Sequence, residues 1–149
     1  MARTAQNVFD TAIALMDEVD ESGATDTSDT LEYKNRTILI LNILIQELYP
    51  YSDTYKTPKK AGRRNTADSI SRMADSIDLD DYIASAVLPY GLAAHLLLEE
   101  NPTAANYFQQ RYDELKARLR DGLLSESEDI EDVYSSGGNG IGFEWTTRW

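Results

Sequence analysis

The residues from 76 to 119 constrain the fold of this chain more than any other segment. An acidic cluster at 78–81 precedes an apolar stretch, and carboxylates in that position accept hydrogen bonds from the free amides at a helix start. Pro89 lies inside the apolar stretch and has no amide hydrogen, so the sequence predicts a helix that is kinked or split there. Gly91 would permit close approach of a neighbouring element.

A second helix is expected directly after the first. Asn101 is placed to cap it, and Pro102 takes the first helical position, where a missing amide costs nothing. Gly122 is expected to end it. Its apolar stripe consists of Tyr107, Phe108, Tyr112, Leu115 and Leu119.

Two more helices are expected before this pair. Apolar residues at three- and four-residue intervals predict a helix from Thr4 to about Asp20. Another runs from about Thr30 to Tyr49, with Asp29 and Glu32 as N-cap and reciprocal partner. Its centre, ILILNILI, is apolar nearly all round, which predicts a helix covered on several sides. A buried strand is the alternative, which the length of the segment disfavours. A short helix is expected over Thr66 to Ser76.

The whole chain has the size and composition of one folded domain. It contains 149 residues, of which 42% are hydrophobic and 27% charged. We therefore expect an all-α protein, a compact bundle of about four main helices with a long basic loop. Residues 1–134 form the helical domain in this interpretation, and residues 135–149 form a flexible, glycine-rich tail with an aromatic end.

Charge and residue usage exclude several classes of function. Acidic side chains number 26 against 14 basic ones, and the resulting net charge of −12 disfavours general nucleic-acid binding. The absence of cysteine excludes disulfides and thiolate metal sites. The longest apolar run, 38–45, is too short for a membrane span, and the first residues do not form an export signal.

The sequence offers little catalytic chemistry. The single histidine, His95, has Glu99 one turn away, and such a pair is a minimal acid–base unit. No nucleophile or second base stands at matching spacing, so a packed or rim histidine is the favoured interpretation and the chain is not expected to be an enzyme.

A cation site is considered and set aside. Residues 18–29 partly resemble a calcium-binding loop of the EF-hand type, with Gly23 in sixth place. The pattern fails at three positions: Glu18 stands where Asp belongs, Thr25 where a β-branched apolar residue belongs, and Asp29 where a bidentate Glu belongs. No metal or cofactor is therefore expected.

A basic loop stands out on this acidic chain. Residues 51–65 contain one acid, Asp53, and five cations that we take as candidate partner-binding residues: Lys56, Lys59, Lys60, Arg63 and Arg64. The loop is either a solvated segment or a docking site for protein. If it binds the acidic face of a neighbouring copy, head-to-tail contacts result, and these close into a ring where the rotation permits.

The C-terminal residues are the other candidate partner-binding segment. Ile141, Phe143 and Trp145 occupy alternate positions, which is the periodicity of a strand, and Trp149 follows. A lone strand needs a partner edge, so we expect strand addition to another protein. Packing of these rings against the chain's own helices stays open.

The run IDLDDYIASAVLPYGLAAHLLLEENPTAANYFQQRYDELKARL, residues 77–119, resembles the helical pair of small head–tail connector proteins of tailed bacteriophages. Asp132-Val133-Tyr134 and the glycine-rich end that follows also resemble their C-termini. Residues 4–20 and 30–49 fit this family by helical type only, and the long basic loop departs from its pattern.

This resemblance implies a structural virion protein, assembled in the host cytoplasm, that forms a homo-oligomeric ring between the portal protein and the tail or stopper proteins. DNA would pass through the ring without sequence-specific binding, and the family supplies no catalytic residues, cofactor or membrane association. The alternative function is an acidic, non-catalytic adaptor or assembly chaperone that binds a basic partner protein.

Overall fold

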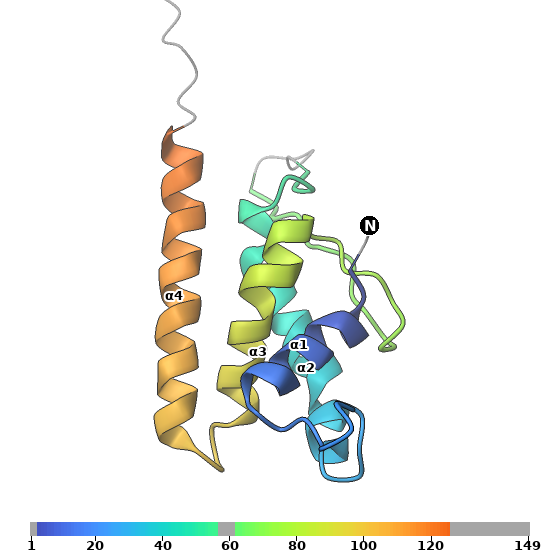
Figure 1. Ribbon diagram of the computed structural model, residues 1–149. Helices are drawn as coiled ribbons and strands as arrows, with labels where there is room; N and C mark the ends of the chain where they lie inside the picture. The colour runs from blue at the N-terminus through green and yellow to red at the C-terminus, as the bar shows by residue number, and fades with distance from the viewer. Residues whose placement is uncertain (1–2, 57–61, 126–149) are drawn as a thin grey trace, which may run out of the picture.

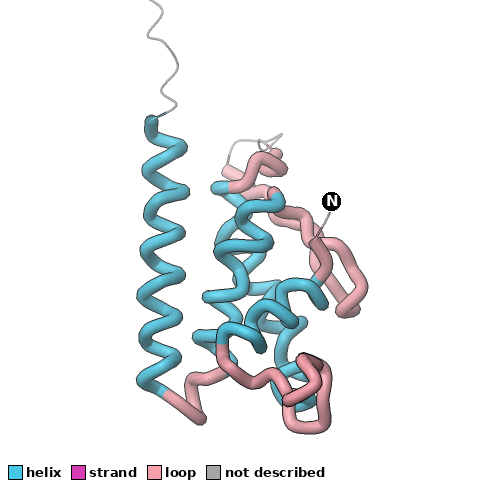
Figure 2. Tube along the Cα trace, in the orientation of Figure 1, coloured by secondary structure: helices cyan, strands magenta, loops and turns pink. Residues whose placement is uncertain are grey.

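A computed structural model of the protein describes residues 3–56 and 62–125. Four α-helices occur in these residues: α1 (Ala5–Leu15), α2 (Leu31–Leu48), α3 (Leu88–Leu96) and α4 (Pro102–Ser125). Two short helices accompany them, the 3₁₀ turn η1 (Tyr49–Tyr51) and the π-helical turn η2 (Ile83–Val87). The described residues contain no strand (Figure 2), only an isolated bridge between Thr4 and Ser76. The predicted all-α bundle of four main helices is confirmed.

Helix α3 lies at the centre of this bundle. Helices α1, α2 and α4 all pack against it, and α4 runs antiparallel beside it (Figure 1). A helix that is apolar on every side has to be covered on every side. Its buried residues are Leu88, Pro89, Gly91, Leu92, Ala93, Ala94 and Leu96.

The helix that was predicted to kink or split at Pro89 runs without a break, but it changes type just before that residue. The helical segment begins at Asp81, and the carboxylate of Asp80 caps it by accepting a hydrogen bond from the amide of Ile83 at 2.9 Å. The π-helical turn η2 follows, and α3 begins only at Leu88. Pro89 thus falls in the first turn of α3, directly after the π-helical turn.

The predicted boundaries of α4 are half right. Asn101 caps the helix, because its side-chain oxygen accepts a hydrogen bond from the amide of Ala104 at 3.1 Å, and Pro102 is the first helical residue. The helix does not end at Gly122, however, but continues to Ser125. Gly122 keeps helical geometry because nothing there requires the left-handed backbone that favours glycine at a helix end.

The predicted extension of the first helix to Asp20 was wrong. Helix α1 ends at Leu15, and Asp17 adopts a left-handed backbone with φ of 62°. The amide of Glu18 then bonds the carbonyl of Ile13 at 3.1 Å, and the amide of Asp17 bonds that of Ala14 at 3.3 Å. This arrangement closes a helix end, and here an aspartate takes the place usually held by glycine.

The predicted cap of α2 was also wrong. The residue before the helix is Thr30, and it makes no side-chain capping bond. Its buried hydroxyl instead donates to the carbonyl of Thr25 at 2.8 Å. Asp29 and Glu32 therefore do not form the expected reciprocal pair, because the turn before the helix is organised around Thr30.

Residues 66–76 do not form the predicted short helix. Their backbone is held by two amide side chains of α2 that lie one turn apart. Asn42 accepts from the amide of Ile70 and donates to its carbonyl, both at 2.9 Å. Gln46 does the same for Ala67, at 3.1 and 2.9 Å. These bonds replace the bonds that a helix would have made, and they keep the segment extended along α2.

We expect Asn42→Ala to release this segment. The substitution leaves the buried amide and carbonyl of Ile70 without partners, so the free energy of unfolding should fall by about 1–3 kcal/mol. Hydrogen exchange at the Ile70 amide should accelerate. Asn35→Ala, at an exposed position of the same helix, is the control and should change stability by less than about 0.5 kcal/mol. Unchanged protection of Ile70 would contradict the assignment.

Helices α2, α3 and α4 approach one another closely at Gly91. A Cβ atom added there would lie 2.9 Å from Cε2 of Tyr112 and 3.2 Å from Cδ1 of Leu44. The first distance is shorter than carbon atoms tolerate without moving. Gly91 therefore lets α4 and α2 approach α3 at the same level, and the close approach expected from the sequence is confirmed.

Two glycine-to-alanine substitutions should have opposite effects on stability. Gly91→Ala should lower the free energy of unfolding by about 1–3 kcal/mol, because Tyr112 must shift. Gly122→Ala should raise it by about 0.5–1 kcal/mol, because its added Cβ meets no atom within 4 Å and alanine favours helix. Urea denaturation of both variants measures the difference. Equal effects would show that the helices do not meet at Gly91.

Candidate interaction surfaces

The basic loop is described at its two ends. Of its five predicted cations, Lys56, Arg63 and Arg64 are exposed. Lys59 and Lys60 lie outside the described residues. The side-chain amide of Asn65 donates to the carbonyl of Lys56 and joins the two limbs at their base. The segment held by Asn42 and Gln46 follows directly. The two described ends of the loop are thus held beside the C-terminal part of α2.

The tyrosines beside this loop are engaged in packing. The ring of Tyr55 meets the buried ring of Tyr49 edge to face, with centroids 5.3 Å apart. Tyr51 is half-buried. Few aromatic faces are left for stacking on nucleobases, which single-stranded nucleic-acid sites require. The described ends of the loop suit ion pairing with carboxylates better.

Helix α2 carries an exposed apolar patch that sequence reasoning missed. Leu39 and Ile43, one turn apart, are 72% and 67% exposed. They face away from the buried residues of the same helix, among them Leu41, Leu44 and Ile45. The run ILILNILI was expected to be covered on several sides, but in the single chain its outer side is open. We call Leu39 and Ile43 the α2 patch.

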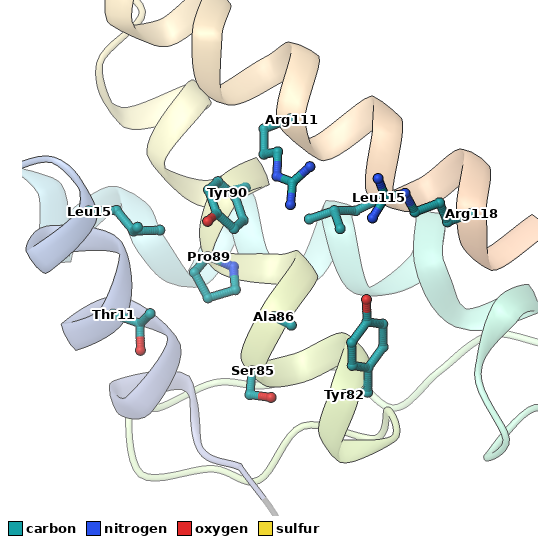
Figure 3. Close-up of a pocket in the computed structure, with 10 residues that line it drawn as sticks. All are labelled: Thr11, Leu15, Tyr82, Ser85, Ala86, Pro89, Tyr90, Arg111, Leu115 and Arg118. Atoms are coloured by element: carbon teal, nitrogen blue, oxygen red, sulfur yellow. The ribbon is translucent and has the colours of Figure 1, made fainter.

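A cleft of about 310 Å³ lies between α1, the η2–α3 segment and α4 (Figure 3). Helix α1 contributes Leu15, and α4 contributes Leu115 between two arginines, Arg111 and Arg118. Pro89 and Ala86 supply apolar surface on the third side, and two tyrosines, Tyr82 and Tyr90, stand beside them. Although the chain is strongly acidic, no carboxylate lines this cleft.

The two arginines of the cleft differ in their surroundings. Arg111 pairs with Glu114 at 2.9 Å, and this hydrogen bond raises the pKa of the guanidinium, with a smaller contribution from Tyr90. Arg118 is exposed, and no acidic side chain among the described residues pairs with it. One cation is therefore partly neutralised while the other is available to an anionic group.

The cleft continues into a second hollow of about 400 Å³ that shares Tyr90 and Arg111 with it. Tyr107, which is 61% exposed, stands at its edge. Its ring packs against that of Phe108 with centroids 5.4 Å apart. Together the two hollows form a grooved face with tyrosine side chains at intervals. Sequence reasoning placed Tyr107 in the apolar stripe of α4 and did not identify this face.

His95 lies exposed in the last turn of α3. No hydrogen bond or ion pair joins it to Glu99, so the two residues do not form the acid–base pair considered from the sequence. His95 also stands outside the cleft. The rim position agrees with the favoured interpretation of this histidine.

Two carboxylates of residues 18–29 have partners within the protein. Asp20 accepts from the hydroxyl of Ser22 at 2.6 Å, and from the amides of Ser22 and Ala24 at 2.8 and 2.9 Å. These bonds, the hydroxyl first, lower the pKa of Asp20. Asp26 forms an ion pair with Lys34. In the described part of the chain no group of three or more metal-ligating side chains is placed to hold a metal ion.

Other predicted features lie outside the described residues. They are the boundary between residues 134 and 135, the flexible tail, and the tail residues Ile141, Phe143, Trp145 and Trp149. None of the helices in residues 3–56 and 62–125 is long and apolar enough to cross a membrane.

Three comparisons of the chain with known proteins found no match. No protein-family model matches it, and neither a curated protein nor a solved structure matches it. The likeness to head–tail connectors therefore rests on the residues that carry it, 77–119 and the C-terminal pattern.

Proposed function

We propose that the protein is a structural subunit of a homo-oligomeric ring, a head–tail connector that joins portal to tail or stopper proteins in a tailed bacteriophage. The observation that carries this proposal is the α2 patch, an apolar surface that the single chain leaves open. The helical-pair resemblance of residues 77–119 supplies the biological setting. The role is non-catalytic and places the protein in the virion.

The α2 patch favours association because of its position as well as its size. Leu39, Asn42, Ile43 and Gln46 share one face of α2 at helical spacing. The two amides on that face hold the segment that continues from Arg63 and Arg64. Apolar surface and positive charge therefore lie side by side. Burying Leu39 and Ile43 would stabilise a contact by about 1.5–3 kcal/mol per side chain.

We take a neighbouring copy as the occupant of this surface. The net charge of −12 means that another copy carries an excess of carboxylates, and these complement the exposed cations beside the patch. A contact between two different surfaces of the same chain is heterologous, and it generates a ring when the rotation closes. DNA would pass through such a ring without sequence-specific contacts.

The double substitution Leu39→Glu and Ile43→Glu should abolish or weaken assembly. Multi-angle light scattering of the full chain at rising concentration measures the oligomeric mass, and electron microscopy shows whether rings form. Each buried carboxylate would oppose the contact, so assembly should need at least about tenfold more protein. Leu98→Glu, at a position 61% exposed beyond α3, is the matched control and should assemble like the unmodified chain.

The same experiment separates the alternative function. An acidic adaptor or chaperone should stay monomeric and bind a basic client, as its charge favours. A connector should form rings or bind purified portal or tail proteins in a sedimentation assay. A strict monomer that binds neither of these proteins contradicts the proposed function.

A further inference from the structure

We propose that the cleft between α1, η2–α3 and α4 binds the acidic C-terminal segment, residues 126–134, of a second copy of this chain. This contact would deepen the proposed function. It rests on that function in one respect, namely that copies of the chain associate. The contact joins the arginines of one copy's cleft to the carboxylates of its neighbour's segment.

The charges of the two partners are complementary. The segment ESEDIEDVY carries five carboxylates and no cation. Two arginines and no carboxylate line the cleft. Arg111 is paired with Glu114 of the adjoining hollow, whereas Arg118 lacks an acidic partner among the described residues. Guanidinium groups bind carboxylates through paired, directional hydrogen bonds. On a chain that mostly repels anions, this cleft is a place that attracts them.

The apolar groups of the two partners also correspond. Within the segment, Ile130, Val133 and Tyr134 interrupt the acids. Within the cleft, apolar side chains lie between and opposite the arginines: Leu15, Ala86, Pro89 and Leu115. Tyr82, which is 54% exposed, stands at the edge and can cover an inserted side chain. A free inorganic anion would use the arginines but leave this apolar surface open.

The direction of α4 favours a second copy over the chain's own segment. Arg118 lies about two turns before the end of α4, and Arg111 about four. The C-terminal turns of α4 extend past the start of the η2–α3 segment (Figure 1), so the helix leads away from the cleft. Residue 126 follows directly, and its own chain would have to reverse at once to bring the acids back. A neighbour's segment needs no such reversal.

Disulfide trapping tests this contact in the full chain, which has no cysteine of its own. Ser85→Cys places a thiol in the cleft, and Ser127→Cys places one in the acidic segment. Mixing the two variants under mild oxidation should give a covalent heterodimer. Ser69→Cys, exposed and outside the cleft, is the matched control and should give little product with Ser127→Cys.

Charge reversal identifies the groups responsible. Arg111→Glu with Arg118→Glu, introduced in the Ser85→Cys copy, should lower the heterodimer yield at least about tenfold. Arg120→Glu makes the same kind of change on the same helix outside the cleft and should leave the yield unchanged. Circular dichroism checks that each variant is folded. Raising the NaCl concentration should also lower the heterodimer yield when Ser85→Cys, with both arginines kept, is mixed with Ser127→Cys.

Several outcomes overturn the inference. Equal trapping by Ser69→Cys, or trapping that survives reversal of both arginines, shows that the cleft does not select the segment. A bridge formed within one chain carrying both Ser85→Cys and Ser127→Cys, without heterodimers in the mixture, assigns the cleft to the chain's own segment. Rings that assemble without trapping overturn only this inference. Trapping without rings overturns the proposed function and leaves this contact standing.

Discussion

The rest of the structure depends on the burial of α3 on nearly every side. Gly91 at its middle allows Tyr112 of α4 and Leu44 of α2 to reach the same level of the helix. Helix α1 closes another side. Because three helices must converge on a short central one, they cannot also cover their own outer faces. The exposed side of α2 and the cleft beside α4 are both consequences of this arrangement.

Two polar side chains of α2 hold residues 66–76, a segment without regular secondary structure, against the bundle. Asn42 and Gln46 act on Ile70 and Ala67 as a neighbouring strand would, because each amide pairs with both backbone groups of one residue. The segment buries Ala67 and Ile70 without becoming helical. The described C-terminal end of the basic loop, which leads into this segment, is thereby held beside α2.

Local sequence signals predicted the parts of the fold that are locally determined. Asp80, Pro89 and Asn101 act on backbone groups within a few residues, so their effects on helix boundaries could be stated in advance. The Thr66–Ser76 segment could not be predicted, because its hydrogen-bond partners on α2 lie more than twenty residues away in the chain. The end of α1 was predicted wrongly for another reason. Asp17 adopts the left-handed backbone that ends the helix, without the glycine that usually marks such a position.

The candidate surfaces were harder to predict than the helices. The sequence identified the cations at Lys56, Arg63 and Arg64 because they belong to one basic stretch, residues 51–65, that contains a single acid. Arg111 and Arg118 stand among acids along the chain, and only the packing of α1 and α3 against α4 brings the two arginines to one cleft that no carboxylate lines. The exposure of Leu39 was equally hidden, since apolar composition does not tell which side of a helix its neighbours cover.

The two surfaces together explain how a chain with a net charge of −12 could associate with itself. Identical copies repel each other over most of their surface, so a stable contact has to place cations of one copy against acids of the next. No residue of α2 lines the cleft, and α2 passes behind α3 when seen from it (Figure 3). The α2 patch and the cleft are therefore two different surfaces. Association through two different surfaces is directional. Burial of apolar side chains would supply the affinity, and the paired charges would set how one copy is aligned on the next.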